Sequence, residues 1–272
     1  MVELKNFWTV WAGMAFNGQS ISNADLRGGP AIQYPGSISS WMYVSTDRRK
    51  KLQLSVGPQW LWGNNNYLRT SDLDVELVYR PSNALNISIN PSFSQNRNQL
   101  QYVTTGTVGG ENRYMMADID QTTFRVSFRA TYMLTPNLSI QYWGQPFGTA
   151  GIYSNFKYIT NARAPVYSQR FTPLPAGYLS STPDGNYNVD ETNKGTPDYS
   201  FEKPDFNIGQ FRSNMVVRWE YIPGSTVFLV WTQEMNGSFY DKPGPQYERY
   251  SFDFDEQAHN IFLMKFTYRF VL

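Results

Sequence analysis

The sequence predicts an all-β fold, an antiparallel up-and-down transmembrane β-barrel with about ten strands, on three observations. Apolar and polar residues alternate along most of the chain, short connections alternate with long ones, and aromatic residues are abundant in a polar sequence. Aromatic residues make up 17% of the 272 residues, although the mean hydropathy is −0.48. A barrel wall needs apolar side chains towards lipid and polar ones towards a wet interior, which accounts for this combination.

The alternation has a period of two residues, which is the period of a β-strand. It is clearest in residues 51–62, where the even positions carry Leu52, Leu54, Val56, Pro58, Trp60 and Trp62. We expect strands of this kind in residues 4–16, 37–46, 51–62, 72–80, 85–94, 124–134, 138–147, 211–221, 226–235 and 260–272. Each is close to the ~9–11 residues that cross a bilayer at a tilt.

Six aromatic or proline residues depart from the simple pattern. In the weaker segments a large side chain falls on the otherwise polar face, at Trp11, Trp41, Trp143 and Phe228. Pro58 and Pro91 each remove a ladder hydrogen bond, so we expect a local bulge at both positions.

The connections follow a regular rhythm of length. Short connections that are rich in Pro, Asn, Gly and Asp, as tight turns are, lie at residues 46–50, 80–84, 135–137 and 223–225. Long ones lie at residues 17–35, 63–70, 96–121, 148–207 and 237–257. Bacterial outer-membrane barrels have short periplasmic turns and long extracellular loops. We therefore expect a single barrel domain over residues 1–272 in a bacterial outer membrane, with both chain ends periplasmic and residues 148–207 forming a long extracellular loop or lid.

A water-soluble β-sandwich or lipocalin-like barrel is the alternative, because there the apolar face points inward. Three features favour the membrane instead. Large aromatic residues lie near the strand ends, charges of both signs lie on the polar face, and the long polar loops lie at one end only.

Charge and cysteine content exclude several classes of function. The net charge is +1, with no basic block and no acidic tail, so the chain has no bulk attraction for nucleic acid. Cysteine is absent, which excludes disulfides and thiolate sites. No run of about 18 apolar residues could form a membrane-spanning helix. The first residues, Met1 to Lys5, lack the basic region of a secretory signal, so we expect a mature or truncated form of an exported protein.

The charged residues on the polar face are the candidates for lumen-lining positions: Asp72, Asp74, Glu76, Arg80, Arg125, Arg129, Arg212, Arg218, Glu220, Lys265 and Arg269. A buried charge must be paired or hydrated. The favoured interpretation is a network of ion pairs that braces the interior. The functional alternative is a charged passage that selects solutes, and its mixed signs predict no strong preference for cations or anions.

The C-terminal strand has the pattern of an outer-membrane insertion signal. Its apolar residues occupy every second position back from the end, at Phe266, Tyr268, Phe270 and Leu272. Leu272 stands where such signals usually have phenylalanine. The alternative is a last strand with one buried face.

Evidence for catalysis or metal binding is weak. Asp184, Asn186, Asn188 and Asp190 are spaced like the first ligands of a calcium loop, but Val189 takes the place of the turn glycine, so a solvated turn is favoured. His259 is the single histidine, and a hydrolase built on it is the least favoured hypothesis. We therefore expect no enzyme activity, no catalytic residue and no cofactor.

Two stretches resemble a known family. The first is Asp25-Leu26-Arg27-Gly28-Gly29-Pro30, and the second runs from Pro204 through Arg218-Trp219-Glu220-Tyr221-Ile222-Pro223-Gly224-Ser225 to Gln233. Together they resemble the C-terminal barrel region of Bacteroidota-type outer-membrane proteins of unknown function, which usually carry an N-terminal carbohydrate-binding module of the family-nine type. That module is not within residues 1–272, so glycan binding by it carries over to no residue here. The resemblance implies an outer-membrane location and a barrel architecture.

The expected partners are outer-membrane lipid, the barrel assembly machinery, and other envelope proteins or strands that lie outside these residues. The first functional hypothesis is a barrel that binds or transports a nutrient at the cell surface, such as one derived from glycans. The second is a non-conducting barrel that scaffolds an envelope complex. The aromatic residues of the long loop suit either stacking on sugars or packing as a lid. The sequence leaves open whether ten strands close on themselves or belong to a larger wall.

Overall fold

The computed structural model describes residues 1–241, 250–254 and 257–270. Its strands are β1 (Val2–Glu3), β2 (Thr9–Asn17), β3 (Ser20–Ser22), β4 (Ile32–Tyr34), β5 (Ser37–Ser45), β6 (Leu52–Gly63), β7 (Leu68–Tyr79), β8 (Leu85–Val108), β9 (Glu111–Thr135), β10 (Leu138–Ile159), β11 (Phe171–Pro173), β12 (Leu179–Ser181), β13 (Asn186–Val189), β14 (Tyr199–Glu202), β15 (Phe206–Ile222), β16 (Ser225–Asp241), β17 (Tyr250–Asp253) and β18 (His259–Thr267). Two short 3-10 helices are η1 (Asn64–Asn66) and η2 (Tyr167–Gln169). Within the described ranges, no helix combines the length and hydrophobicity that crossing a membrane would require.

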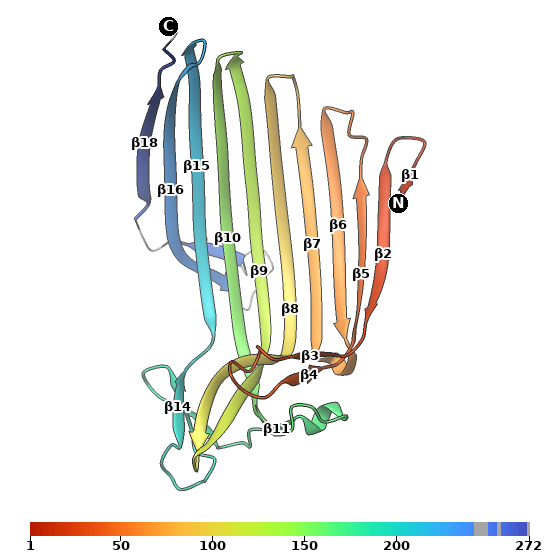
Figure 1. The fold of residues 1–272 in the computed structure, drawn as a ribbon, viewed down its shortest axis with the longest axis vertical. Coiled ribbons are helices and arrows are strands. Elements are labelled where there is room, and N and C mark those ends of the chain that lie inside the picture. Colours follow the sequence, from red (N-terminus) through yellow and green to blue (C-terminus); the bar gives the residue numbers. More distant parts are fainter. Residues whose placement is uncertain (242–249, 255–256, 271–272) are drawn as a thin grey trace.

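The main sheet is an antiparallel meander, as the sequence predicts. Its long strands pair in the order β2-β5-β6-β7-β8-β9-β10-β15-β16, with β18 on β16. These are the ten strands expected from the alternation. The short turns lie at one end of the sheet and the long connections at the other (Figure 1).

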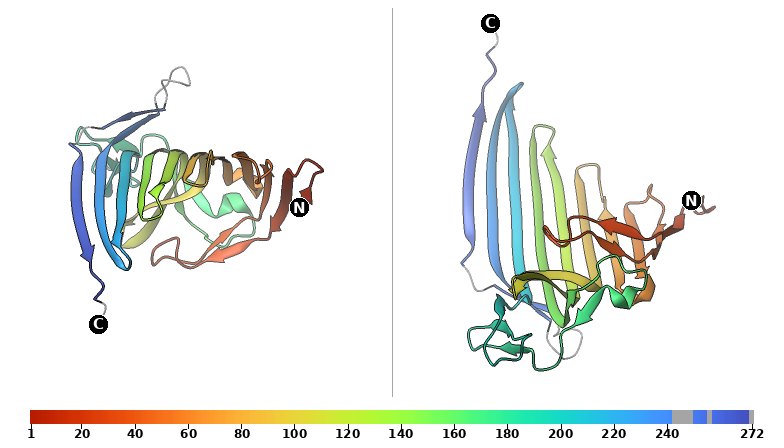
Figure 2. Two further views of the ribbon diagram at one scale, coloured as in Figure 1. Left: turned by 90° about the horizontal axis from the view of Figure 1, so that it is seen from above. Right: turned by 60° about the horizontal axis from the view of Figure 1, so that its bottom comes forward.

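The sheet does not close in the described part of the chain. Its first long strand, β2, carries only the two-residue strand β1 on its outer side, and no pairing joins either of them to β18. Viewed from above, the strands form a curved trough that is open along one side (Figure 2). The all-β antiparallel fold is therefore confirmed, and the ten strands by themselves leave two edges.

Three central strands are much longer than expected. β8, β9 and β10 have 24, 25 and 22 residues, so much of the predicted loops 96–121 and 148–207 is strand. Only Gly109 and Gly110 turn between β8 and β9, both at the positive φ that glycine accepts readily. Residues 148–159 belong to β10, and the rest of the predicted lid includes a small sheet, β12-β13-β14.

The expected bulges at Pro58 and Pro91 are wrong. Pro58 pairs with Leu73 and Pro91 with Val126 without any shift of register. A proline removes one hydrogen bond but adds no residue, so the register can continue past it. The shifts fall at the long-connection end instead, at Asn98/Gln101, Tyr102/Thr104 and Ser154/Lys157, and beside the turns at Leu138/Ser139 and Glu220/Ile222.

The dry core of the described residues lies at the long-connection end and not between the strands. One buried cluster contains Leu26, Ile32, Tyr67, Leu100, Met116 and Ala162. The other contains Met115, Ala117, Phe156, Val189 and Phe201. Met115 and Met116 point to opposite sides of β9, so the projecting β8-β9 ribbon is covered on both faces. We call the segments that cover it, residues 20–34 and 160–205, the crown (Figure 2).

Candidate functional site

The concave face of the main sheet carries the polar residues predicted to line a lumen. Cross-strand partners share a face, and Asp74 pairs with Ser92, which pairs with Arg125. A hollow of about 550 Å³ opens on this face, and six successive strands contribute to its lining. Its lining residues are Tyr43, Ser55, Asp74, Val75, Glu76, Ser88, Asn90, Ser92, Arg125, Ser127, Arg129 and Gln145.

The hollow is open to solvent and only loosely ion-paired. The Arg125 guanidinium lies 3.7 Å from the Asp74 carboxylate, and both side chains are about half exposed. No ion pair within the described residues involves Arg129 or Glu76. The side chains that line the hollow can therefore offer charges of both signs, hydroxyls and amides to a solute.

Further pairs follow the same face towards β18. Arg212 donates to Glu234 at 3.0 Å, and Arg218 donates to Glu220 at 2.8 Å. Lys265 shares the face, because it pairs with Phe228 and so follows Arg218 in the ladder. Arg269 lies beyond the end of β18, where its backbone N–H donates to the Ser225 hydroxyl at 2.9 Å.

The aromatic residues that broke the pattern do lie on the polar face. The register places Trp11 opposite Tyr43, Trp143 opposite Arg129, and Phe228 opposite Arg218. Trp143 uses its indole N–H to donate to the Ser127 hydroxyl at 3.0 Å. Trp41 packs over Gly13, whose missing side chain leaves room for the indole ring. Aromatic rings thus flank the hollow.

The opposite, convex face carries the apolar residues, which are half-buried to fully exposed. Leu54 is 40% exposed and Phe266 60%, while Phe262 and Met264 reach 76% and 70%. The even positions of residues 52–62 share this face with Tyr79, Leu77 and Leu73 of β7. In the described structure, the apolar side chains of these strands therefore do not gather into a dry centre.

We call the apolar side chains of the convex face the apolar stripe. This stripe ends abruptly towards the long-connection end of the sheet. On β8 it runs from Leu85 to Phe93, and Arg97 follows on the same face. On β9 it ends at Phe124, beyond which Asp120 pairs with Arg97 at 2.9 Å, with both side chains more than half exposed. Arg69 of β7 stands directly opposite Arg97. A line of charged residues therefore borders the apolar stripe.

Three of the residues predicted to form an insertion signal are exposed, namely Phe266, Tyr268 and Phe270. Phe266 stacks on Tyr221 at 5.6 Å between ring centroids. β18 ends at Thr267, so Tyr268 and Phe270 lie past the strand, where their rings contact each other at 4.8 Å. Leu272 lies outside the described residues.

The calcium-loop candidates form a β-hairpin instead of a loop around an ion. Asp184 is in the turn between β12 and β13, while Asn186 and Asn188 are in β13. The Asp190 carboxylate accepts hydrogen bonds from the backbone N–H groups of Lys194 and Gly195. Nowhere in the described ranges do three or more His, Cys, Asp or Glu residues gather as a metal site would need.

The single histidine lies at the start of β18. His259 lies in β18 opposite Glu234, exposed, and on the same face as Lys265. The Glu234 carboxylate accepts hydrogen bonds from Arg212 and Gln210, so it belongs to the row of polar side chains on the concave face.

Charged pairs fix the crown to the long strands. Arg113 of β9 donates to Glu191 at 3.0 Å, and the Tyr199 hydroxyl donates to the other oxygen of Glu191 at 3.0 Å. Burial, together with that carboxylate, raises the pKa of Tyr199. Lys194 and Thr192 donate to Asp198, and the hydrogen bond from Lys194 is the largest cause of a pKa lowered to about 2.

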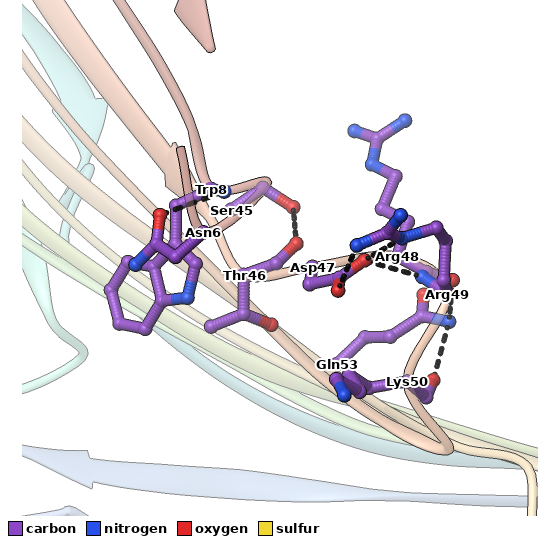
Figure 3. A network of polar contacts seen from close by, with 9 residues as sticks. All are labelled: Asn6, Trp8, Ser45, Thr46, Asp47, Arg48, Arg49, Lys50 and Gln53. Atoms are coloured by element: carbon purple, nitrogen blue, oxygen red, sulfur yellow. Dashed lines mark hydrogen bonds and ion pairs between the residues drawn. The ribbon is translucent and has the colours of Figure 1, made fainter. Parts of the chain in front are cut away.

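A group of cations that the sequence reasoning missed gathers at the opposite end. Residues 48–51 are Arg-Arg-Lys-Lys, and Arg80 of the next short turn joins them around a hollow of about 490 Å³. Asp47 accepts from Arg49 at 2.9 Å, which lowers the Asp47 pKa to about 2 (Figure 3). The expectation of no basic block is wrong for the folded chain, because a hairpin brings two turns together.

Nearly the whole chain matches a protein family. Residues 2–271 match the family described as a domain of unknown function (DUF5916). No curated protein matches the chain.

Proposed function

The chain belongs to the DUF5916 family, whose description assigns no activity, and we propose from the geometry that it forms wall strands of a bacterial outer-membrane β-barrel. In this proposal the convex face contacts hydrocarbon and the concave face lines an interior that binds or passes a polar nutrient. The short turns are periplasmic, and the crown is extracellular.

The height of the apolar stripe is the observation that carries the proposal. The stripe covers residues 52–62 on β6, 85–93 on β8 and 124–134 on β9. About ten residues at ~3.3 Å each, tilted by ~40°, span about 25 Å, which is the height of the apolar band on outer-membrane barrels. The strands β8 and β9 continue past Arg97 and Asp120 with polar residues. The height of the apolar stripe is therefore smaller than the length of these strands and matches the thickness of an apolar layer.

The two open edges support membership of a larger wall. A sheet edge in hydrocarbon would leave backbone N–H and C=O groups without partners, at a cost of several kcal/mol each. We therefore propose that strands from outside residues 1–272 pair with β2 and β18. A wall of more than ten strands would also be wide enough to leave an interior that side chains do not fill.

The chemistry of the concave face suits a neutral, hydroxyl-rich solute. Ser88, Asn90 and Ser127 offer hydrogen-bond donors and acceptors, while the charges of Asp74 and Arg125 balance. Tyr43 and Trp143 provide ring faces on the same side. Sugars combine such hydroxyls with apolar C–H faces, and a nutrient derived from glycans fits both.

A non-conducting scaffold is the second candidate, and the crown favours it. Arg170 donates to the backbone carbonyls of Gln33 and Ala164, at 2.7 and 2.8 Å, and so ties two crown segments together. Segments bound in this way across the open side of the trough can block passage.

Permeation separates the two candidates. The full-length protein is reconstituted in liposomes, and swelling is measured with neutral sugars of increasing size, before and after residues 160–205, the larger crown segment, are replaced by a short Gly-Ser loop. Sugar entry that rises on removal of this segment supports the passage. Protein that is inserted but admits no sugar in either form contradicts the passage and supports the scaffold.

A further inference from the structure

The cations at the short-turn end form one continuous patch from two turns. The backbone N–H of Arg80 donates to the carbonyl of Lys51 at 2.7 Å, which holds the turns side by side. Both side chains are exposed and line the same hollow of about 490 Å³, together with Arg48, Arg49 and Lys50. We call these five residues the basic corner.

Within the described residues, an ion pair is recorded for only one of the five cations of the basic corner. Asp47 neutralises Arg49 through two hydrogen bonds of 2.9 Å, and the Arg49 guanidinium also lies over the Phe7 ring, 3.2 Å from its centroid. For the other four cations, no carboxylate of the described residues lies within ion-pair distance. Like charges repel when they share a hollow, so the arrangement favours a bound anion.

The patch adjoins the end of the apolar stripe. Leu52 directly follows Lys51, is 56% exposed, and pairs with Tyr79 on the convex face. Tyr79 in turn directly precedes Arg80. Leu85, the first residue of the stripe on β8, lines the hollow itself. On two adjacent strands, β6 and β7, an apolar residue of the convex face is therefore the direct sequence neighbour of a cation.

We propose that the basic corner binds the phosphate head group of an anionic phospholipid of the periplasmic leaflet. The acyl chains lie against Leu52 and Tyr79, and Lys51, Arg80 and their neighbours donate to the phosphate oxygens. A phospholipid matches the surface because its anion and its apolar chains are adjacent in the same order. This inference rests on the proposed membrane wall and adds a specific lipid site to it.

Lipid-selective quenching tests the site directly. The 272 residues contain no cysteine, so Leu52→Cys in the otherwise intact full-length protein gives one label position in this region. A fluorescent label at that position is quenched by vesicles that contain either brominated phosphatidylglycerol or brominated phosphatidylcholine. We expect stronger quenching by phosphatidylglycerol in mixed vesicles. Since each basic residue near a membrane surface contributes about a fivefold preference, Lys51→Gln with Arg80→Gln should reduce it about 25-fold.

Matched variants separate a charge effect from a folding effect. Lys51→Arg with Arg80→Lys keeps both charges and should keep the preference for phosphatidylglycerol. Arg69→Gln with Arg97→Gln removes two charges at the other border of the stripe and should leave quenching at position 52 unchanged.

The outcomes distinguish this inference from the proposed function. Equal quenching by both lipids overturns the lipid site while the wall in hydrocarbon stands, and it would direct attention to an acidic periplasmic protein as the partner of the corner. No quenching by either lipid contradicts the membrane wall, and with it the lipid site.

Discussion

Arg113 and Glu191 are 78 positions apart in the chain, yet the guanidinium donates to the carboxylate at 3.0 Å and holds the crown on β9. The Glu191 side chain is only 9% exposed. Glu191→Ala would leave the Arg113 and Tyr199 donors without their acceptor, which costs about 1–3 kcal/mol for a group that stays shielded. We expect faster proteolysis and hydrogen exchange in residues 178–202, with the long strands unaffected. Unchanged protection of that segment would show that apolar packing alone fixes the crown.

Gly148 makes room for the β16-β17 hairpin on the convex side of the sheet. Phe239 is fully buried against it, and any side chain at position 148 would overlap the Phe239 ring. Gly148→Val should displace the ring and cost about 1–3 kcal/mol of stability, as overpacking does. Gly18→Val is the control, because nothing surrounds that position. Equal unfolding midpoints in urea for the two variants would contradict the packing.

The acid sensitivity of the crown depends on Asp198. Lys194 donates to this carboxylate at 2.6 Å, and the pKa falls from 3.8 to about 2. A lowered pKa in the fold means that the stabilisation is complete above about pH 4 and is lost as the pH falls towards 2. Protease sensitivity of residues 190–199 should therefore rise in that range, and Asp198→Asn should remove the pH dependence. A transition centred near pH 6 would assign it to another group.

The charges of the hollow predict ion selectivity if the interior conducts. Asp74 and Arg125 balance each other, so the intact protein should show a reversal potential close to zero in a salt gradient. Arg125→Glu with Arg129→Glu converts the floor to a net negative one, which should favour cations. Ser88→Ala is a neutral control on the same floor. An unchanged reversal potential would place the conducting path away from this face.

The sequence predicts the ten long strands because each repeats its apolar residues at every second position over the stripe. Trp11, Trp41, Trp143 and Phe228 were identified as exceptions, and the register places at least three of them opposite polar-face partners. The polar halves of β8, β9 and β10, which lie at the long-connection end, escape prediction because both of their faces carry mixed residues. Their partners are crown segments far away in the chain, so no local period marks them.

The crown and the basic corner depend on contacts that local patterns do not encode. Met115 and Met116 look alike in the sequence, yet they enter different buried clusters. Residues 48–51 are visible as a run of cations, but Arg80 joins them only through the β6-β7 hairpin. The alternating pattern does not reveal the open edges either, because β2 and β18 would show the same alternation if they paired with each other.

Labelling of adjacent residues tests the central claim most directly. Leu73 and Asp74 are neighbours in β7 that face opposite sides, and single cysteines there report on the two faces of the wall. Leu73 is 42% exposed on the convex face, and Asp74, whose side chain is 46% exposed, lines the concave hollow. In the full-length protein in outer membranes, the account predicts that a label at position 73 is quenched by brominated lipid and that a cysteine at position 74 reacts with a water-soluble thiol reagent. A label at position 73 that is open to the aqueous reagent and unaffected by lipid would contradict the membrane wall.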